Sequence, residues 1–497
     1  MMDTDLSFFV ILTTAIALIL MWFLANQKNR KYNLPPGPTP IPVIGTLYLD
    51  LFWKLETLLP TFKKRYGGVM LLKGGPFRVV LLNSIEAVRE AFIANAHVMS
   101  HRGSHLSYTI GQSNPHRKGI LESDYGASFR ENRKLSLSIF RNLGIGRAII
   151  EEKIIEEGER LCESIRTFGG KPFDPWHAIS CSVANVILSV VLNKQYSHDD
   201  PQLLKVLKDT DDQIAVGKHA NLIDCMPILR FLQPFKNSLK LMKSSNESIK
   251  QIVWSSVKDH LTKFELGHVS DFVDGWIEKH FDTEKQTAQF DEDNFNQVVR
   301  DMLLAGTETT ATSLKWSIII LANNPDIQAK LHAELHRVLE PDQVIRLKDK
   351  ERLPYLEAFI WEVQRFKTIG PLALPHSTQT ATKLCGYDIP ADSFIFANLT
   401  GIHMDETVFE HPTEFRPERF LDSEGRFQKH PNVIPFGIGK RSCLGEILAR
   451  HELFLFTAVL TQRFKFVLPE GISRISEEGV LNFVYCPERF KIRAIPN

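Results

Sequence analysis

The chain has few cysteines, almost no net charge and no fixed-period repeat. Its six cysteines form no Cys-x-x-Cys pair and are scattered as Cys162, Cys181, Cys225, Cys385, Cys443 and Cys486. This spacing argues against a disulfide scaffold and a zinc-type site, and it is typical of a reducing compartment. The formal net charge of +1 gives no global field that would attract nucleic acid.

The chain also lacks linkers rich in Gly, Pro or Ser between large segments. With 43% hydrophobic and 24% charged residues, its composition is that of a folded protein rather than a disordered one. A length of 497 residues would allow about three domains. The absence of linkers and repeats instead favours one large domain or two closely packed lobes.

One long apolar run stands near the N-terminus, at residues 6–25. These twenty uncharged residues would span about 30 Å as a helix, which is the thickness of a bilayer core. Lys28, Arg30 and Lys31 follow the run, so the positive-inside rule places the rest of the chain in the cytosol. A cleaved signal peptide is the alternative, and it would have a shorter apolar core, a basic start and a small-residue cleavage site.

A proline-rich segment follows the apolar run. Its five prolines within residues 35–42 make the backbone stiff and extended and exclude a helix. We therefore divide the chain into an N-terminal membrane anchor (residues 1–27), a basic and proline-rich hinge (28–45) and one main domain (46–497).

Two further segments lack regular periodicity. Residues 96–126 are rich in Gly, Ser and His, and a long irregular segment in a compact domain is often a binding loop. Residues 225–235 carry apolar side chains around Pro227 and Pro234. This second segment would close over a site, dip into a membrane surface or simply connect two packed helices.

The most informative stretch is the glycine-rich loop at residues 435–445, which contains Cys443. A run with helical spacing follows it, so Cys443 would lie beside unpaired N–H groups and the positive end of a helix dipole. Both favour a thiolate. Gly437, Gly439 and Gly445 would let the backbone pass close to a large flat group, and Arg441 supplies a cation for a carboxylate. The pattern predicts a thiolate ligand for a haem iron, with Arg441 on a haem propionate.

This loop resembles the haem-binding loop of the cytochrome P450 family. The match is Phe436-x-x-Gly439-x-Arg441-x-Cys443-x-Gly445, which has five fixed positions in ten residues. The resemblance covers nearly the whole chain and looks closest to the animal microsomal branch (clan 2) that oxidises drugs and steroids. It implies a mainly α fold, a helical prism with a small β-rich N-terminal lobe, plus an N-terminal transmembrane helix. It also implies haem b as cofactor and a single-pass location in the endoplasmic reticulum membrane, with the haem-thiolate catalytic domain in the cytosol.

A second motif lies at the centre of a long helix expected from Asp291 to Ala322. The sequence Ala305-Gly306-Thr307-Glu308-Thr309-Thr310 contains poor choices for a helix interior. A Thr hydroxyl can also divert a backbone hydrogen bond and open the helix locally. The motif resembles the oxygen-activating groove of the family, which implies that Glu308 and Thr309 deliver protons during catalysis.

A charge pair, Glu362-x-x-Arg365, resembles the Glu-x-x-Arg of the family, and its spacing puts both ions on one helix face. The same spacing occurs elsewhere, so only the place of this pair, before a Pro-rich extended segment, selects it. The sequence Pro-Glu-Arg-Phe occurs twice, with Arg419 before the cysteine loop and Arg489 after it. Chain order selects Arg419 as the third member of a structural Glu362–Arg365–Arg419 network and leaves Arg489 as a surface residue.

Other residues are assigned by the resemblance alone. Arg133, His376 and Arg102 would contact the haem propionates. For His376 and Arg102 the alternative is a loop residue that bonds to local backbone. Phe129 stands where the family has tryptophan, so an indole N–H donor is missing. The substrate pocket would be lined by apolar residues, which implies a lipophilic substrate such as a steroid, a fatty acid or a xenobiotic: Ala305, Leu372, Leu374, Val480 and Leu481.

The resemblance implies a monooxygenase that inserts one oxygen atom of dioxygen into that substrate. Because no Gly-x-Gly-x-x-Gly flavin or nicotinamide fingerprint is present, electrons would come from NADPH–cytochrome P450 reductase. Four basic residues would steer this partner or would simply be solvated charges, and they are Arg130, Lys134, Arg141 and Lys440. Two other functions stay open: a thiolate-haem isomerase or lyase that acts on peroxides, and a haem-binding sensor without turnover.

Overall fold

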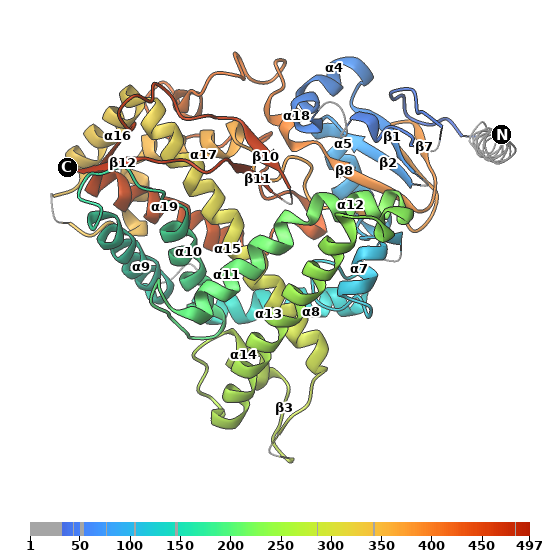
Figure 1. Ribbon diagram of the computed structural model, residues 1–497, viewed down its shortest axis with the longest axis horizontal. Helices are drawn as coiled ribbons and strands as arrows, with labels where there is room; N and C mark the ends of the chain where they lie inside the picture. The colour runs from blue at the N-terminus through green and yellow to red at the C-terminus, as the bar shows by residue number, and fades with distance from the viewer. Residues whose placement is uncertain are drawn as a thin grey trace, which may run out of the picture.

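The computed structural model describes residues 32–497 except positions 43, 50–53, 76, 104–105, 145–147, 286, 341–342 and 483. Long helices fill most of the molecule, and a small sheet lies at the end nearest the N-terminus (Figure 1). The fold is therefore mainly helical with small sheets, as the sequence predicts.

The helices in the first part of the chain are α3 (Leu55–Leu58), α4 (Phe62–Tyr66), α5 (Ile85–Arg89), α6 (Ala96–Met99), α7 (Tyr108–Ser113), α8 (Ala127–Asn142), α9 (Ala148–Arg166), α10 (Trp176–Val191), α11 (Pro201–Ala215), α12 (Gly217–Cys225), α13 (Phe235–Lys263) and α14 (Phe272–Lys279). Those that follow are α15 (Glu292–Asn323), α16 (Pro325–Val338), α17 (Pro354–Phe366), α18 (Leu399–His403) and α19 (Glu446–Arg463). Shorter 3-10 or π turns are η1 (Leu59–Thr61), η2 (Glu90–Ala94), η4 (Pro227–Phe231), η5 (Leu347–Arg352), η6 (Pro417–Phe420) and η7 (Gly439–Arg441).

The strands are β1 (Val69–Gly74), β2 (Phe77–Leu82), β3 (Phe281–Asp282), β4 (Thr287–Ala288), β5 (His376–Ser377), β6 (Thr382–Leu384), β7 (Tyr387–Ile389), β8 (Ser393–Ala397), β9 (Phe464–Val467), β10 (Gly479–Leu481), β11 (Tyr485–Pro487) and β12 (Arg493–Pro496). Four of them form one sheet in the order β1–β2–β8–β5. The hairpin β1–β2 is antiparallel, with Val69 opposite Leu82, whereas β2 and β8 run parallel, with Arg78 opposite Ser393. This sheet therefore joins the N-terminal part of the chain to the segment that precedes the cysteine loop.

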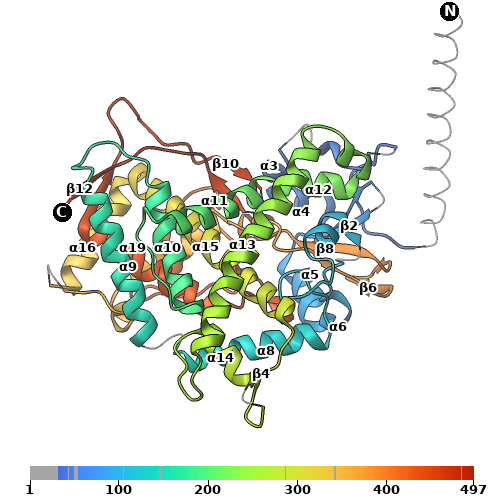
Figure 2. The ribbon, with the colours of Figure 1, turned by 60° about the horizontal axis from the view of Figure 1, so that its bottom comes forward.

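The core of the helical part is built around α10 and α15, which lie side by side (Figures 1 and 2). Every residue of α10 from Ala178 to Val191 is buried, as expected for a helix that is apolar on all sides. At Gly306 the two helices meet closely, since an added Cβ would lie 3.0 Å from the side chain of Ile187. Glycine at this position therefore serves the packing of α15 on α10.

The long helix expected from Asp291 to Ala322 is α15, and its predicted bounds are correct within one residue. Asp291 caps it by accepting a hydrogen bond from the Asn294 N–H. The region 96–126, expected to be irregular, contains the two short helices α6 and α7. In the segment 225–235, the side chains of Ile228, Phe231 and Leu232 are 63%, 64% and 53% exposed, so they do not pack as an interior helix connection.

The start of the described chain lies along the sheet. The carbonyl of Pro36 accepts a hydrogen bond from the Leu71 N–H at 2.8 Å, and an added Cβ at Gly37 would lie 1.9 Å from the Leu71 oxygen. This part of the proline-rich segment is therefore bound to β1. The apolar run at residues 6–25 lies outside the described residues, and no helix within them has the length and hydrophobicity of a membrane span.

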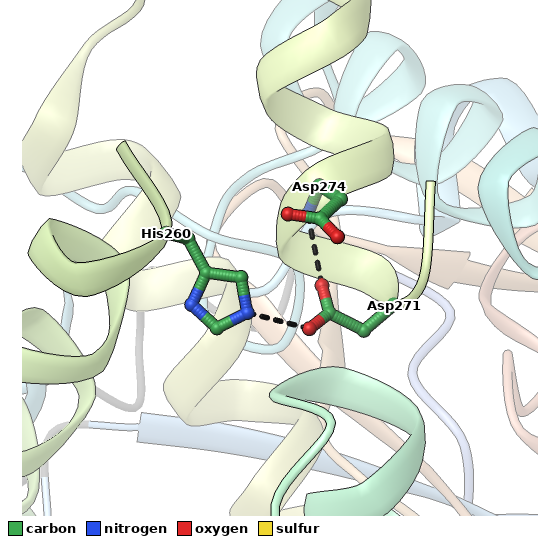
Figure 3. A group of neighbouring side chains, drawn as sticks. All are labelled: His260, Asp271 and Asp274. Atoms are coloured by element: carbon green, nitrogen blue, oxygen red, sulfur yellow. Dashed lines mark hydrogen bonds and ion pairs between the residues drawn. The ribbon is translucent and has the colours of Figure 1, made fainter. Parts of the chain in front are cut away.

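A histidine near the end of α13 is bonded to the start of α14 (Figure 3). The His260 Nε2 atom lies 2.6 Å from Asp271 Oδ2, and its Nδ1 atom lies 2.8 Å from the Ser256 carbonyl oxygen. Asp271 is fully buried and caps α14 by accepting from the Asp274 N–H. Burial disfavours the charged imidazole, but the hydrogen bond and charge of Asp271 outweigh it and raise the pKa of His260 above its ordinary 6.5.

We expect His260→Gln to change how stability depends on pH. Because the folded pKa of His260 is raised, its stabilising charge is fully present below 6.5 and is lost as the pH rises through the folded pKa. At about pH 6 the wild type should exceed the variant by about 1 kcal/mol in free energy of unfolding, allowing for partial solvent screening. The difference should shrink toward about pH 9. Urea denaturation across this range measures it, and a pH-independent difference would exclude a charged clamp.

Candidate functional site

Cys443 lies just before α19, which begins at Glu446. Its N–H donates to the Phe436 carbonyl at 2.9 Å, and its sulfur accepts from the Gly445 N–H. The side chain is accessible, yet the surrounding protein still desolvates it, so burial raises the pKa of the thiol. The Gly445 amide and the nearby guanidiniums of Arg133 and Arg450 only oppose this rise. The expected effect of the helix start is present, because the Gly445 N–H lowers the pKa, but burial outweighs it.

The glycines of the cysteine loop serve different purposes. An added Cβ at Gly439 would lie 2.1 Å from the Phe92 oxygen, so this glycine is required by the approach of the loop to η2. At Gly437 and Gly445 no protein atom lies within 4 Å of an added Cβ. Gly437 and Gly445 therefore border open space, whereas Gly439 contacts protein backbone.

Arg441 joins the loop to a distant part of the chain. Its guanidinium donates to three backbone carbonyls, those of Ser100 at 2.9 Å, Ile120 at 3.0 Å and Ser123 at 2.6 Å. It also lies 3.7 Å from the centre of the Phe129 ring. The phenylalanine that stands in place of tryptophan thus provides an aromatic surface for this cation, a contact that the sequence analysis missed.

Arg102 makes a similar set of backbone bonds. Its Nε donates to the Leu121 carbonyl at 2.9 Å, and its Nη1 donates to the Pro375 carbonyl at 2.7 Å. Its own N–H donates to Asp124 at 2.8 Å. The local backbone contacts that were the alternative role for Arg102 are therefore present.

His376 is buried next to these arginines and is held by backbone as well. Its Nδ1 lies 2.8 Å from the Met99 carbonyl, and its ring stacks on Phe92 with centroids 3.8 Å apart. Burial, and then the charges of Arg102 and Arg441, hold the pKa of His376 well below its ordinary value. The imidazole is therefore a neutral donor at physiological pH.

Three arginines gather around a single carboxylate. Burial and the proximity of other arginines lower the pKa of Arg441 to about 8, while burial lowers that of Arg102 to about 10, with Asp124 opposing the shift in both. Arg133 contributes a third positive charge and donates to Ser442 Oγ at 3.2 Å. Asp124 acts on Arg102 and Arg441, and Arg133 acts on both of these arginines, so the three positive charges lie near one another. Such a donor set fits a ligand with two carboxylates, as haem has in its propionates.

Between residues 297 and 322, the central helix is open only near its middle. Leu304, Ala305, Gly306 and Thr309 are partly exposed, while the residues on either side of this stretch are buried. The Thr309 hydroxyl donates to the Ala305 carbonyl at 2.7 Å, which is the side-chain-to-backbone bond expected of a helical threonine. Thr307 makes the equivalent bond to Leu303 at 2.8 Å but is buried. Thr309 is thus placed at the open face, and Thr307 is not.

The Glu308 carboxylate forms its polar contacts with residues other than its neighbour Thr309. Its Oε1 accepts from Thr312 at 2.8 Å, lies 3.4 Å from Lys315 Nζ and lies 3.6 Å from Cys486 Sγ. Lys315 is fully buried over the ring of Trp176, at 3.8 Å. The sequence analysis missed Lys315, although its spacing of seven residues from Glu308 places both on one helix face.

The residues expected around a substrate are all at least partly accessible. Val480 is 45% exposed, and those that are half-buried are Ala305, Leu372, Leu374 and Leu481. Val480 and Leu481 belong to the hairpin β10–β11, whereas Leu372 packs against a small cluster that includes Phe62 and Met70.

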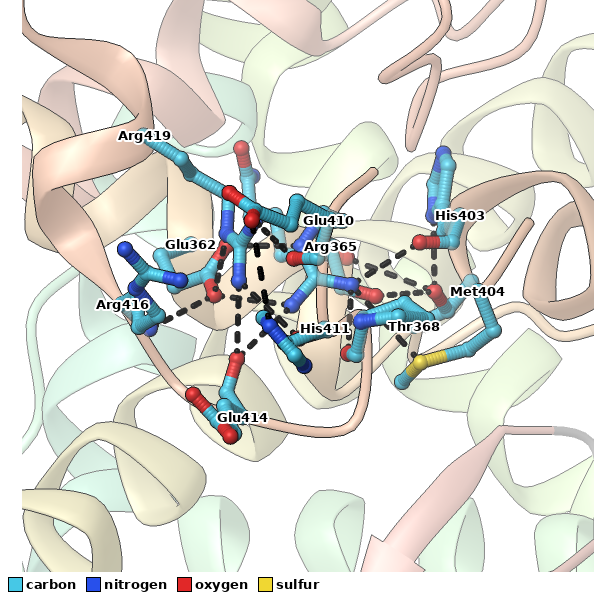
Figure 4. A network of polar contacts seen from close by, with 12 residues as sticks. Glu362, Arg365, Thr368, His403, Met404, Glu410, His411, Glu414, Arg416 and Arg419 are labelled. Carbon is cyan, nitrogen blue, oxygen red and sulfur yellow. Dashed lines mark hydrogen bonds and ion pairs between the residues drawn. The ribbon is translucent and has the colours of Figure 1, made fainter. Parts of the chain in front are cut away.

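A network of polar contacts brings together Glu362, Arg365 and Arg419 (Figure 4). Arg365 binds both carboxylate oxygens of Glu362, at 2.7 and 2.8 Å, and both side chains are fully buried. Arg419 adds a third bond at 3.0 Å, and the Arg416 N–H adds a fourth at 2.8 Å. Two guanidiniums and a backbone donor thus compensate one buried carboxylate.

The remaining N–H groups of this network hold the chain between α18 and η6. Arg365 donates to the carbonyls of His403 and Pro412, both at 2.9 Å, and Arg419 donates to that of Glu414 at 3.0 Å. Arg489, in the second Pro-Glu-Arg-Phe sequence, has a side chain that is 61% exposed and pairs with Asp174 at 3.1 Å. The arginine of the first Pro-Glu-Arg-Phe copy therefore belongs to a buried ion network, whereas the arginine of the second copy lies at the surface.

Comparison with known proteins gives one consistent result. The family model described as Cytochrome P450 matches residues 35–494. Cytochrome P450 2D15 of Canis lupus familiaris is 33% identical over 494 residues, which is 98% of each chain. Cytochrome P450 2U1 of Rattus norvegicus is 34% identical over 507 residues, covering 97% of this chain and 94% of that protein. Vitamin D(3) 25-hydroxylase of Sus scrofa is 32% identical over 494 residues, covering 97% of both.

We expect Arg419→Ala to lower the free energy of unfolding by about 2–4 kcal/mol, because it leaves a buried carboxylate short of a partner. Arg489→Ala changes the same residue type in the same local sequence and is the matched control. Its exposed ion pair should be worth less than about 1 kcal/mol. Denaturant unfolding of the two variants measures both values, and equal losses would exclude a special role for Arg419.

Proposed function

This chain belongs to the cytochrome P450 family, and we propose that it works at the endoplasmic reticulum membrane with haem b and electrons from NADPH–cytochrome P450 reductase. As a member of the family, it is a haem-thiolate monooxygenase that acts on lipophilic substrates with dioxygen and a redox partner. The observation that carries the site assignment is the group of three guanidiniums beside the Cys443 loop, those of Arg102, Arg133 and Arg441.

In this proposal Cys443 would ligate the haem iron, and the three arginines would hold the propionates. The one N–H of neutral His376 is already donated to the Met99 carbonyl, so His376 would donate to a propionate only as an imidazolium, which a nearby carboxylate favours. Haem supplies the activation of dioxygen and the insertion of one oxygen atom. Arg133 lies close enough to Cys443 for the two charges to interact, and its guanidinium donates a hydrogen bond to Ser442 Oγ. Phe436, Gly437 and Gly445 would border the ring, with Phe436 fixed under the guanidinium of Arg450 at 4.7 Å.

The proposed relay group at the open face of α15 is the Thr309 hydroxyl. Its hydrogen is donated to the Ala305 carbonyl, so its oxygen would accept a hydrogen bond from a water molecule and hold that water as the proton donor. Glu308 would supply protons from the side where it meets Lys315 and Thr312. Because Glu308 is bonded away from Thr309, transfer between them requires a water or a rotation of the glutamate side chain.

The proposed docking surface for the reductase is one face of α8. Arg130, Lys134, Leu137 and Arg141 are exposed and follow the helical spacing of 4, 3 and 4 residues, so they share one face. Lys440 is exposed in the cysteine loop. Another residue of α8, Arg133, reaches Ser442 beside Cys443. A negatively charged partner on this face would therefore lie close to the proposed haem site.

The proposed membrane attachment has two parts. Residues 6–25 would span the bilayer as a single helix, and the ranges 1–27, 28–45 and 46–497 would be anchor, hinge and catalytic domain. The exposed side chains of Ile228, Phe231 and Leu232 would rest on the same membrane surface, because exposed apolar clusters mark such contacts.

We expect Cys443→Ser to abolish the thiolate-type Soret band of the reduced carbon monoxide complex, because a serine oxygen does not replace a thiolate ligand. Cys385→Ser is the control, since Cys385 is also accessible but lies beside Glu90 on the β lobe. That variant should keep the band unchanged. Survival of the band in the Cys443 variant would disprove the ligand assignment.

We also expect Thr309→Ala to raise the amount of hydrogen peroxide released per NADPH consumed, by a factor of about 3 or more, because the hydroxyl at the open face is lost. Thr307→Ala removes the same kind of hydroxyl from a buried position of the same helix. It should leave the coupling ratio near the wild-type value. Peroxide and NADPH assays in the reconstituted system measure the ratio, and equal leakage from both variants would contradict the proposed role.

A further inference from the structure

A fully buried lysine on α15 is bonded to the glutamate of the proposed proton relay. Lys315 Nζ donates to Glu308 Oε1 at 3.4 Å, across seven residues or about two turns of the helix. The Lys315 side chain is 0% exposed and that of Glu308 is 6% exposed. When one charge of such a buried pair is lost, the other is left without compensation. The charge state of Glu308 is therefore coupled to Lys315.

An aromatic ring holds the ammonium group of Lys315. Its Nζ lies 3.8 Å from the centre of the ring of Trp176, which begins α10. Cation–π attraction is strongest for tryptophan and for a desolvated cation, so this contact fixes the position of Nζ. The same ring lies 4.6 Å from the guanidinium of Arg489, whose side chain is 61% exposed. Lys315 therefore belongs to a group of charges that reaches from the central helix to the surface.

Two further contacts hold the Glu308 carboxylate on the side of Lys315. Its Oε1 also accepts from the Thr312 hydroxyl at 2.8 Å and from the Cys486 thiol at 3.6 Å. Burial, and then the charge of Glu308, raise the pKa of this thiol to about 12, so Cys486 stays a neutral donor. The carboxylate must leave these partners before it reaches Thr309.

The charges around Glu308 come from three parts of the fold. Lys315 lies on α15, Asp211 lies on α11 and Arg489 follows β11. Burial, and then the charges of Glu308 and Asp212, raise the pKa of Asp211, while Lys315 and Arg489 oppose the rise. Two carboxylates and two cations therefore act on one another here, and Lys315 is the cation that is bonded to Glu308.

We propose that Lys315 is a positioning residue for the reaction, which holds the Glu308 carboxylate in an ion pair away from Thr309 until the carboxylate takes up a proton. Protonation removes the attraction to Lys315, so the neutral acid is free to turn toward Thr309. There it gives the proton to the water on the Thr309 hydroxyl and returns to Lys315 as a carboxylate. Each cycle moves one proton from solvent to that water. This inference rests on the proposed proton relay and adds the residue that controls it.

The test follows the carboxylic acid C=O stretch of Glu308 by infrared difference spectroscopy of the haem-loaded protein across a pH titration, with Glu308→Gln to assign the band. Because Lys315 favours the carboxylate, Lys315→Met should move the midpoint to higher pH by about one unit or more. Lys315→Arg keeps the cation and should restore the wild-type midpoint. Lys367→Met is the matched control, since Lys367 is also a buried lysine over a tryptophan ring, at 4.9 Å, but pairs with Glu477. It should leave the midpoint unchanged.

A second readout is the hydrogen peroxide released per NADPH consumed, measured without added substrate over the same pH range. Its pH profile should shift with the infrared midpoint in Lys315→Met and return in Lys315→Arg. Trp176→Leu leaves the ion pair itself unaltered and should shift both readouts in the same direction by a smaller amount.

Equal infrared midpoints in the wild type and Lys315→Met would overturn the proposal. A shifted midpoint with an unchanged peroxide profile would overturn it too, because Glu308 would then not deliver the proton. Products that carry oxygen from dioxygen would in either case leave the monooxygenase function intact.

Discussion

Burial of three guanidinium groups beside the cysteine loop is the constraint on which the site depends. Moving such charges out of water costs several kcal/mol each unless hydrogen bonds and opposite charges compensate. Arg441 finds three backbone carbonyls between residues 100 and 123, and Arg102 finds two more at Leu121 and Pro375. These bonds join four segments that are far apart in the sequence. They satisfy donors of the two guanidiniums, whose positive charges would suit the carboxylates of haem.

A second buried charge cluster, around Glu362, holds the segment of chain that leads to the cysteine loop. Glu362 is enclosed by Arg365, Arg419 and the Arg416 N–H, and the arginines pass their remaining donors to carbonyls between residues 403 and 414. This segment would be difficult to order by apolar packing alone, since it is mostly turn. The helical core supports the opposite side, where α15 packs on α10 through Gly306 and keeps its open face at Ala305 and Thr309.

Much of the fold and the loop follows from local sequence. The ends of α15 have clear signals, Asp291 before it and Pro325 after it, and both appear where expected. The grouping of Glu362, Arg365 and Arg419 came from the resemblance to the family, which supplied both the Glu-x-x-Arg motif and the chain order, and the three side chains do meet. Contacts to backbone carbonyls have no such signature, so the partners of Arg441 and Arg102 were not predicted. The grouping of Arg102, Arg133 and Arg441 depends on tertiary packing, and so does the burial that raises the pKa of the Cys443 thiol against the effect of the Gly445 N–H.

The central claim is that this chain inserts one atom of dioxygen into a lipophilic molecule. Turnover under isotopically labelled dioxygen tests this claim most directly, with purified protein, reductase, NADPH and a panel of lipophilic substrates. Mass spectrometry of the products should show one labelled oxygen atom per product molecule, and labelled water should form in parallel. Products without the label, or rearranged peroxides formed without NADPH, would contradict a monooxygenase.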